Sequence, residues 1–525
     1  MAKPSNPSDP VELGPSEPRP GDAAEYAFIV RFSGELSLKG KRARNRFIDR
    51  LVHNLADALR SHGYRYRFER RWSRLYFTAS SPDAAAVAAR VFGVRAVAAV
   101  EKRRWQTPED LVERGYEIFR QEVAGRTFAV RVRRGEHAST QNFRSPDLER
   151  ALGERLLPDA AGVRLKSPEV EVRIELQGQD AYFYSRSISG ESGLPMGTEG
   201  RALVLFSGGL DSPVAAWAVH RRGVRTDLLF CNLGGDQHLR DVVRVAKIIA
   251  DQWSFGGGPT LIVVDMQQLA EEIHGKVPPK LRQVVLKRQM LRLGERVAAG
   301  RGIRTLVTGE AIGQVSSQTL DNLLVTSSAS TIPVLRPLMA WNKEEIIDKA
   351  RHLGTFDLSS QVTEFCGLEG SVAPSARVKA TAVEVAEREL DAALLDRSIE
   401  AKVEIDLRSF CFGDVASFEV EVASIPEGAV LLDLRPARAF SSWHPEGATS
   451  LPYPEALERF EALDRSATYA VYCELGLKSA HLVERMNRAG FKAFHLPRGL
   501  GDFRAAVERD SALLAALSPA LRAPS

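Results

Sequence analysis

The chain has 525 residues, of which 44% are hydrophobic and 26% charged, with a formal net charge of +4 and four cysteines. This composition excludes a wholly disordered chain, a collagen and a coiled-coil rod, and no apolar run reaches the ~18 residues of a membrane span. Four scattered cysteines without a CxxC pair exclude a disulfide scaffold and a zinc site. We therefore expect no metal-ligand cluster and a reducing, cytoplasmic compartment.

The basic charge is concentrated in the first third of the chain. Residues 26–190 carry 31 Lys and Arg against 20 Asp and Glu, whereas residues 191–525 are net acidic. A one-sided basic excess favours a polyanionic partner such as nucleic acid, and a solvated basic surface is the alternative.

The first 190 residues predict two consecutive α+β modules behind a disordered leader at 1–25, which is rich in Pro, Ser, Gly and Glu. Thr107 is placed to cap the helix that follows it. Strands are expected at 27–32, 64–68, 75–78, 94–100, 128–132, 170–176 and 181–187, and helices at 44–62, 83–92, 108–122 and 145–156. A linker is expected at 193–197.

From Arg201 onward, short aliphatic strands alternate with helical patterns, which predicts a parallel sheet. These strands are expected at 202–206, 226–232, 260–264 and 305–308. A charged helical pattern at 380–401 is expected to connect to a last α/β unit. That unit should hold strands at 430–433, 469–472 and 493–495 and a helix at 479–489.

A Gly-rich turn follows the first of these strands, with the sequence Ser207-Gly-Gly-Leu-Asp-Ser212. The order strand, glycine turn, helix lets backbone amides and a helix N-terminus approach an anion. A carboxylate at Asp211 would repel phosphate, so we expect it to hold Mg²⁺ or to position the group that is adenylated. The sequence lacks a Walker A motif and resembles the PP-loop of ATP pyrophosphatases, which adenylate a substrate and release pyrophosphate.

A cysteine in the last unit lies between a strand and a helix. Amide donors and the helix dipole would stabilise a thiolate or persulfide at Cys473. Leu432-Asp-Leu-Arg435, Phe440, His444-Pro-Glu-Gly447 and Leu451-Pro452 match the rhodanese pattern upstream. Many rhodaneses close the loop with Arg, where Lys478 and Ser479 stand here, and Glu474 beside the sulfur opposes thiolate formation.

Further segments point to one family. They are Gly34-Glu-Leu-Ser-Leu-Lys-Gly-Lys41, Gly193-Leu-Pro-Met-Gly197, Val285-Leu-Lys-Arg288, Thr308-Gly-Glu-Ala-Ile-Gly-Gln-Val-Ser-Ser-Gln-Thr319, Leu335-Arg-Pro-Leu338 and Glu364-Phe-Cys-Gly367. With the PP-loop, they resemble the tRNA 4-thiouridine synthase (tRNA sulfurtransferase) family in its rhodanese-containing form, over about residues 26–500. The resemblance implies a multidomain α/β and α+β fold. Its modules are a ferredoxin-like domain (26–82), a THUMP RNA-binding domain (83–190), a PP-loop ATP pyrophosphatase with a parallel sheet (198–379), a helical connector (380–417) and a rhodanese-like domain (418–520).

The resemblance also implies an enzyme that uses ATP and Mg²⁺ to adenylate uridine 8 of tRNA and then transfers persulfide sulfur to it. The implied partners are tRNA, a cysteine desulfurase as sulfur donor, and a sulfur-carrier protein through which the thiazole of thiamine is made. No membrane partner is expected, and a homodimer is implied.

The family's motifs imply the site residues. The ATP site would comprise Leu205, Phe206, Ser207, Gly208, Gly209, Asp211, Ser212, Lys287, Gly309 and Gln318. Phe230 is expected either to flank the nucleotide or to be a core aromatic. The basic residues proposed to bind tRNA are Lys39, Lys41, Arg42, Arg131, Arg133 and Arg134. Cys366 would be a second catalytic cysteine that forms a redox disulfide with Cys473, whereas Cys231 and Cys411 receive no function.

Two other functions remain open at this point. One is a sulfur-relay enzyme for thiamine synthesis only, which would show no salt-sensitive affinity for tRNA. The other is a non-catalytic tRNA-binding protein with a decayed ATPase, against which the intact PP-loop and both loop cysteines argue.

Overall fold

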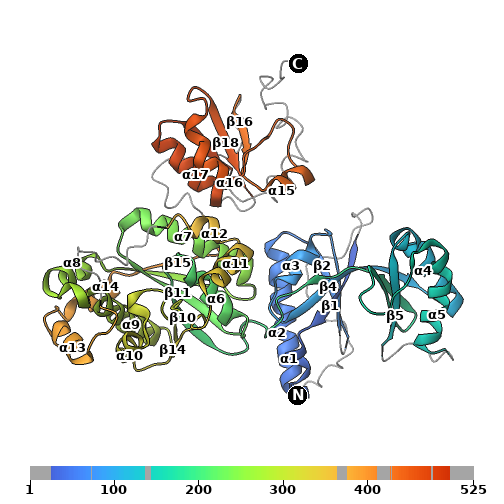
Figure 1. The fold of residues 1–525 in the computed structure, drawn as a ribbon, viewed down its shortest axis with the longest axis horizontal. Helices are drawn as coiled ribbons and strands as arrows, with labels where there is room; N and C mark the ends of the chain where they lie inside the picture. Colours follow the sequence, from blue (N-terminus) through green and yellow to red (C-terminus); the bar gives the residue numbers. More distant parts are fainter. Residues whose placement is uncertain are drawn as a thin grey trace, which may run out of the picture. The chain divides into compact units, whose positions relative to one another are not determined.

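The computed structural model describes residues 25–71, 74–135, 143–362, 375–410, 426, 428–473 and 477–496 (Figure 1). The chain divides into two compact units, Met1–Thr198 with Arg221–Gly223, and Glu199–His220 with Val224–Ser525. Residues 1–24 of the expected leader, Cys366 and Cys411 lie outside the described residues. Among the described residues, no helix combines the length and the apolarity needed to cross a membrane.

The first unit is built on one mixed sheet in the order β2-β3-β1-β4-β8-β7-β5-β6, with β9 paired to β4. Its strands are β1 (Tyr26–Phe32), β2 (Tyr66–Arg71), β3 (Arg74–Ala79), β4 (Val94–Arg104), β5 (Thr127–Arg134), β6 (Gly162–Val163), β7 (Val170–Gln177), β8 (Asp180–Tyr184) and β9 (Ile188–Ser189). Strands β7 and β8, which are consecutive in the chain, pair antiparallel as a hairpin.

Strand β4 joins the two expected modules into a single sheet. Its first half pairs antiparallel with β1, from Val94 to Val100, and its second half pairs antiparallel with β8, from Glu101 to Arg104. One strand is therefore shared by both modules. The expected division at residues 82–83 remains a prediction.

The helices of this unit follow the apolar spacing of the sequence. They are α1 (Gly34–Ser37), α2 (Lys41–Ser61), α3 (Ala84–Ala89), α4 (Pro108–Val123), α5 (Ser145–Leu156) and η1 (Leu157–Asp159). Phe47, Leu51, Leu55 and Leu59 form one buried stripe on α2. Thr107 caps α4 in a capping box with Asp110, as its position predicted.

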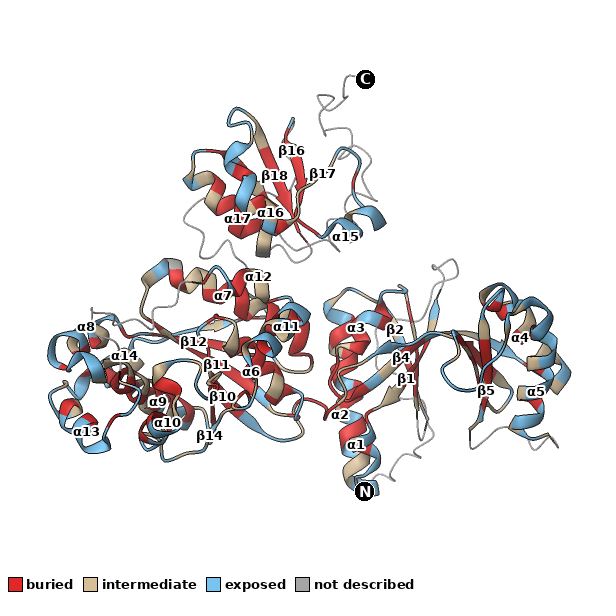
Figure 2. Cartoon of the chain, in the orientation of Figure 1, coloured by how far each residue is buried: buried red, intermediate tan, exposed pale blue. Residues whose placement is uncertain are grey.

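The second unit contains a six-stranded sheet in the order β14-β13-β10-β11-β12-β15. Its strands are β10 (Arg201–Leu205), β11 (Arg225–Asn232), β12 (Thr260–Asp265), β13 (Leu306–Val307), β14 (Val334–Leu335) and β15 (Val403–Asp406). All neighbours pair in parallel except β15, which lies antiparallel to β12. Strands β10 to β12 and helix α6 (Asp211–His220) are largely buried (Figure 2).

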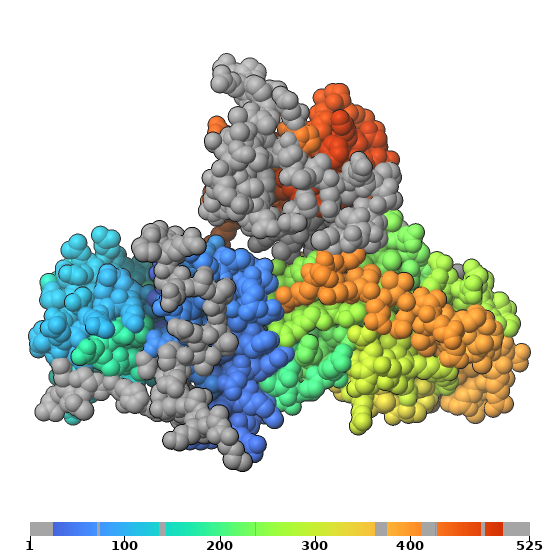
Figure 3. All heavy atoms as spheres, turned by 180° about the vertical axis from the view of Figure 1, so that it is seen from behind, coloured from blue at the N-terminus to red at the C-terminus, as the bar shows by residue number. Residues whose placement is uncertain are grey.

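Helices surround this sheet. They are α7 (Gly235–Trp253), α8 (Gln267–Lys276), η2 (Pro279–Leu281), α9 (Arg282–Gly300), η3 (Ser316–Gln318), α10 (Leu320–Ser327), α11 (Lys343–Leu353), α12 (Phe356–Ser359), α13 (Ala380–Arg388) and α14 (Ala393–Glu400). In Figure 3, residues 380–400 (orange) lie on the surface beside α8 and α9, and both α13 and α14 contact α9.

The helical connector expected at 380–417 contains two helices and a short strand within its described residues, 380–410. Its helices pack on α9, and strand β15 follows them and extends the sheet at β12. Residues 380–406 therefore pack with the PP-loop sheet, and the boundaries of the expected connector remain a prediction. The sequence pattern did not indicate β15 because Val403-Glu-Ile-Asp406 is too short to show a period of its own.

The last part of the second unit holds a parallel sheet in the order β17-β16-β18-β19. Its elements are β16 (Val430–Asp433), α15 (Ala437–Ser442), β17 (Thr449–Ser450), α16 (Tyr453–Arg459), η5 (Phe460–Ala462), β18 (Thr468–Tyr472), α17 (Leu477–Arg488) and β19 (Lys492–His495). The three strands and the helix expected here are all present.

Candidate active site

In the sheet that carries the PP-loop, the order in which the chain adds strands reverses next to β10. From β10 the chain moves to β11 and β12 on one side, and β13 pairs with β10 on the other side. The carboxyl ends of β10 and β13 therefore flank a topological switch point, which is where open parallel sheets bind ligands. The Gly-rich turn follows β10, and the loop from Thr308 to Thr319 follows β13.

The Gly-rich turn is fixed by a side chain of the helix that it opens. Ser212, in the first turn of α6, is buried, and its Oγ accepts hydrogen bonds from the backbone N–H groups of Ser207 and Gly208, each at 3.2 Å. Gly208 has φ = +77°, a conformation that favours glycine, and its missing Cβ would lie 3.0 Å from Val242. The turn therefore presents backbone amides and a helix N-terminus in a fixed shape, which suits an anion.

Gly309 allows the two loops to meet. A Cβ at this position would lie 2.9 Å from the carbonyl carbon of Asp211 and 3.0 Å from the backbone nitrogen of Ser212. No side chain fits between these backbones. Glycine is thus required here because the loop after β13 packs directly against the start of α6.

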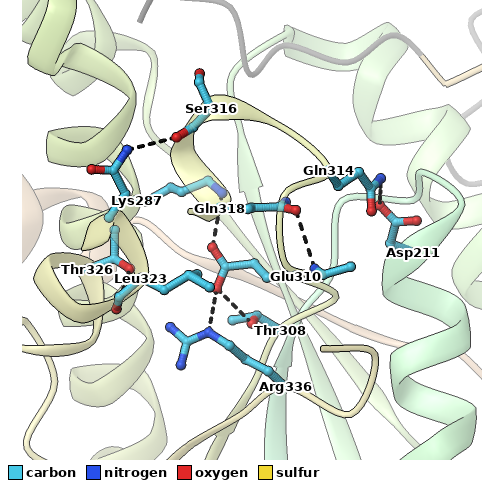
Figure 4. Close-up of polar contacts among 12 residues, drawn as sticks. Asp211, Lys287, Thr308, Glu310, Gln314, Ser316, Gln318, Leu323, Thr326 and Arg336 are labelled. Atoms are coloured by element: carbon cyan, nitrogen blue, oxygen red, sulfur yellow. Dashed lines mark hydrogen bonds and ion pairs between the residues drawn. The ribbon is translucent and has the colours of Figure 1, made fainter. Parts of the chain in front are cut away.

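A half-buried carboxylate in the loop after β13, Glu310, holds two cations from other parts of the chain (Figure 4). Glu310 pairs with Lys287 Nζ at 3.0 Å and with Arg336 Nε at 2.8 Å, and it accepts a hydrogen bond from Thr308 Oγ1 at 3.1 Å. Burial by itself would raise the pKa of Glu310, but the charges of Lys287 and Arg336 outweigh that effect and lower it. Glu310 is therefore ionised at neutral pH and holds both cations in place.

Asp211 is held between two groups that the sequence did not single out. Its Oδ1 lies 3.1 Å from Lys343 Nζ, and its Oδ2 accepts a hydrogen bond from Gln314 Nε2 at 2.9 Å (Figure 4 shows the latter). Lys343 is the first residue of α11. An ordinary lysine at the exposed start of a helix gives no signal in the sequence, so the pair with Asp211 was found only in the structure.

The other residues expected at the ATP site fall into two groups. Gln318 lies in the loop after β13, where its Oε1 accepts a hydrogen bond from the Ala311 N–H at 3.3 Å. Leu205 ends β10, and the buried Phe206 follows it directly before the Gly-rich turn. Phe230 is buried in β11, where its ring packs edge-on against His238 with a centroid distance of 4.7 Å. From the sequence, Phe230 is expected either to flank the nucleotide or to be a core aromatic, and this packing fits a core aromatic.

The side chains available as metal ligands indicate how the site could hold Mg²⁺. Within the residues that the structure describes, no group of three or more His, Cys, Asp or Glu side chains could hold a metal ion. Asp211 alone fits the usual setting of Mg²⁺ in nucleotide sites, in which one or two carboxylates and the phosphates share the ion.

The cysteine expected to carry sulfur, Cys473, directly follows β18. Cys473 is 4% exposed, and its Sγ lies 3.4 Å from the Ser479 backbone nitrogen and 3.5 Å from Ser479 Oγ in the first turns of α17. Behind the strand, Asp433 accepts a hydrogen bond from Tyr472 at 2.6 Å and pairs with Arg435 at 2.6 Å. The Ser479 N–H therefore donates to the sulfur, and the Ser479 hydroxyl and the first turn of α17 lie beside it.

The basic residues expected to bind tRNA differ in their exposure and in their contacts with other residues. Lys41, Arg42 and Arg133 are exposed. Lys39 lies over the Phe47 ring at 5.0 Å. Arg131 donates to the Leu165 carbonyl at 2.7 Å, and Arg134 donates to the Phe143 carbonyl at 2.6 Å. Of the six, Lys41, Arg42 and Arg133 are therefore the most accessible to a polyanion.

Four family models match the chain in succession. They are the ThiI ferredoxin-like domain (residues 27–98), the THUMP domain (106–186), the Thiamine biosynthesis protein (ThiI) (197–392) and the rhodanese-like domain (421–506). A tRNA sulfurtransferase of Pyrobaculum aerophilum is 35% identical over 477 residues, covering 90% of this chain and 96% of the relative. The chain belongs to the tRNA sulfurtransferase family. A second member, from Shewanella woodyi, is 35% identical over 470 residues, covering 86% of this chain and 96% of its own length.

Solved structures agree with this family. A crystal structure of a 4-thiouridine synthetase–RNA complex with bound ATP has a TM-score of 0.63 and 25% identity, covering 73% of this chain and 99% of its own. PH1313 from Pyrococcus horikoshii shares the fold with a TM-score of 0.50 and 23% identity, over 63% of this chain and 99% of its own. The expected tRNA sulfurtransferase family and the multidomain fold are thus confirmed.

Proposed function

We propose that this chain is an ATP-dependent tRNA sulfurtransferase that makes 4-thiouridine at position 8 of tRNA. The observation that carries the proposal is the meeting of Asp211 of the PP-loop with Lys343 and Gln314 at one switch point of the sheet. The relatives named tRNA sulfurtransferase, and the solved 4-thiouridine synthetase–RNA complex with bound ATP, support the same reaction.

The first step is adenylation of the uridine. The C4 oxygen attacks the α-phosphorus of ATP, the bond to the β-phosphate oxygen breaks, pyrophosphate leaves, and N3 gives up its proton. The turn at 207–210 and the N-terminus of α6 bind phosphate oxygens, and Lys287 adds a cation. Lys343 offsets the charge that develops near Asp211. Mg²⁺, when bound through Asp211, supplies further charge neutralisation.

The second step replaces AMP with sulfur. The terminal sulfur of a Cys473 persulfide attacks C4 and AMP leaves, which forms a C4–S–S–Cys473 linkage. The thiolate of Cys366 then attacks Cys473 Sγ, the S–S bond breaks, and the electron pair stays on the sulfur at C4 while N3 takes up a proton. Alternatively, Cys366 attacks the persulfide first and the hydrosulfide released attacks C4. Both routes end in a Cys366–Cys473 disulfide that a dithiol must reduce.

The partners follow from this chemistry. A cysteine desulfurase loads Cys473, tRNA is the acceptor, and a sulfur-carrier protein for thiazole synthesis is a second acceptor. A reducing cytoplasm supplies the dithiol, and a homodimer remains part of the proposal. The first unit, with the basic excess, contributes the tRNA-binding surface.

The test is mass spectrometry of the nucleosides of tRNA incubated with the full chain, ATP, Mg²⁺, cysteine and a desulfurase. Wild-type protein should form 4-thiouridine at position 8. Cys473→Ala should abolish it and leave tRNA-dependent pyrophosphate release near the wild-type level, because adenylation needs no sulfur.

Cys231→Ala is the matched control. Burial raises the pKa of the Cys231 thiol to about 12, so this cysteine is not a nucleophile at neutral pH and its loss should leave thiolation intact. Full thiolation by Cys473→Ala would contradict the assigned sulfur route. Absence of tRNA-dependent pyrophosphate release would favour a decayed ATPase, and sulfur transfer to a carrier protein without tRNA thiolation would favour the relay function.

A further inference from the structure

Three charged side chains meet at the loop that follows β13. The carboxylate of Glu310 lies between Lys287 of α9 and Arg336, which directly follows β14 (Figure 4). Because β14 pairs in parallel with β13, the residues that follow these two strands lie at the same edge of the sheet. The segment Leu335-Arg-Pro-Leu338, part of the family resemblance but without an assigned role, therefore supplies one charge of this cluster.

The two oxygens of the carboxylate have different partners. Lys287 Nζ contacts Oε1 of Glu310 at 3.0 Å, whereas Arg336 Nε and Thr308 Oγ1 donate to Oε2 at 2.8 and 3.1 Å. Each oxygen therefore has its own cation, and the negative charge is divided between two basic groups.

The two cations differ in exposure. The side chain of Lys287 is 24% exposed, whereas those of Glu310 and Arg336 are 12% and 10% exposed. A ligand that enters the site can therefore reach Lys287 more readily than Arg336. Arg336 acts on such a ligand mainly through its charge and through the carboxylate that it contacts.

The charge balance of the site depends on Arg336. Glu310 and Lys287 alone would form a neutral pair, which attracts a phosphate only weakly. Arg336 restores a positive excess, and its charge is permanent because a guanidinium does not lose its proton in proteins. The other ion pair of the site, Asp211 with Lys343, adds equal and opposite charges. The positive excess of these side chains is therefore the contribution of Arg336.

We infer that Arg336 is a positioning residue of the ATP site, which acts through Glu310 to keep the charge of Lys287 available to the phosphates. The inference rests on the proposed function, in which Lys287 adds a cation at the phosphates. Glu310 then serves as a shared counter-ion that orients both basic groups.

The experiment measures the Kd of ATP with Mg²⁺ for full-length variants by isothermal titration calorimetry without tRNA. Arg336→Gln should weaken ATP binding by about 10- to 100-fold, the range expected for the loss of one charge in a partly buried site. Arg336→Lys keeps the charge and should recover most of that loss. Adenosine, which carries no phosphate, should bind all variants equally, whereas a distorted site would weaken its binding as well.

A second substitution separates charge from structure. In Glu310→Gln/Arg336→Gln, Lys287 keeps its charge and no carboxylate opposes it, so ATP binding should recover most of the loss seen in Arg336→Gln. A merely structural role predicts the opposite, because removing both partners disturbs the loop at least as much as removing one. A double variant that binds ATP no better than Arg336→Gln would overturn the inference, and so would unchanged ATP binding in Arg336→Gln.

The unfolding temperature of each variant guards the test against misfolding. In Arg336→Gln, Glu310 keeps Lys287 and Thr308 as partners, so no carboxylate is left unpaired and we expect the variant to fold. If it does not fold, the double variant is compared with Glu310→Gln, from which it should differ by the same loss of about 10- to 100-fold. Equal Kd values in that comparison would overturn the inference.

The matched control removes a charge outside the cluster. Arg304 is exposed and precedes β13, at the opposite end of that strand from the loop, so Arg304→Gln should leave ATP binding unchanged. A loss in Arg304→Gln equal to that in Arg336→Gln would overturn the inference, because the overall charge of the protein would then explain both. Wild-type protein that does not bind ATP would instead contradict the proposed function, so the two failures are distinguishable.

Discussion

Asp211 meets its two partners only because the chain folds. Gln314 and Lys343 follow it by 103 and 132 positions, and no spacing rule links residues so far apart. The glycines and the carboxylate of the PP-loop, by contrast, form a short motif whose chemistry the sequence alone indicates. The sequence therefore indicates the local motif, whereas the groups that the sheet brings to it are found only in the structure.

Lys343→Met should reduce tRNA-dependent pyrophosphate release by about 10² to 10³, the usual cost of removing one charge-stabilising donor from an active site. Binding of tRNA should be unaffected, because the variant leaves the basic first unit unchanged. The measurement is single-turnover pyrophosphate release. Lys349→Met is the matched control on the same helix, where the lysine lies over the Trp217 ring at 4.1 Å. Equal losses in the two variants would point to a structural role of the helix.

At the scale of elements, the sequence predicted most of the strands, and the two that it missed in the PP-loop sheet are short. Strand β14 has two residues and β15 has four, too few to show the alternation that identifies a strand. Each exists because an edge of the sheet offers it hydrogen bonds. The loop after β13 is equally dependent on tertiary contact, since Gly309 is required only by the backbone it meets.

Gly309→Ala should impair the active site more than its size suggests. The added Cβ would lie 2.9 Å from the backbone of Asp211, and backbone atoms cannot move aside as a flexible side chain does. We expect a loss of pyrophosphate release, and a free energy of unfolding of the second unit that is lower by about 1–3 kcal/mol, the usual cost of overpacking.

Gly302→Ala provides a comparison, because nothing lies within 4 Å of its missing Cβ, although its φ of +65° carries a backbone cost. That variant should lose stability and keep pyrophosphate release in the folded fraction. Wild-type release in Gly309→Ala would show that the two loops need not touch.

At the scale of the whole molecule, the charge distribution matters more than the net charge of +4. The basic residues 26–190 form two modules on a single sheet, joined through β4. A polyanion that binds this sheet would release counterions in proportion to the charges it neutralises.

Replacing the exposed Lys41, Arg42 and Arg133 with Gln should weaken tRNA binding and reduce the slope of log affinity against log salt by roughly 2–3. Equilibrium binding over a salt series measures this slope. Arg438, Arg459 and Lys492, exposed in the last α/β part, form the control set, and their replacement should leave the slope unchanged. An unchanged slope in the first triple variant would remove these three residues from the tRNA surface.

The sequence by itself determined the order of modules, the PP-loop, the cysteine between β18 and α17 and the basic first third, because each depends on residues that are close in the chain. Only the tertiary structure decided the pairing of Asp211 with Lys343, the pairing of Glu310 with Lys287 and Arg336, and the addition of β15 to the sheet. The physical reason is that parallel strands collect their carboxyl ends at one edge, so residues a hundred or more positions apart become neighbours whose hydrogen bonds and charges no local pattern encodes.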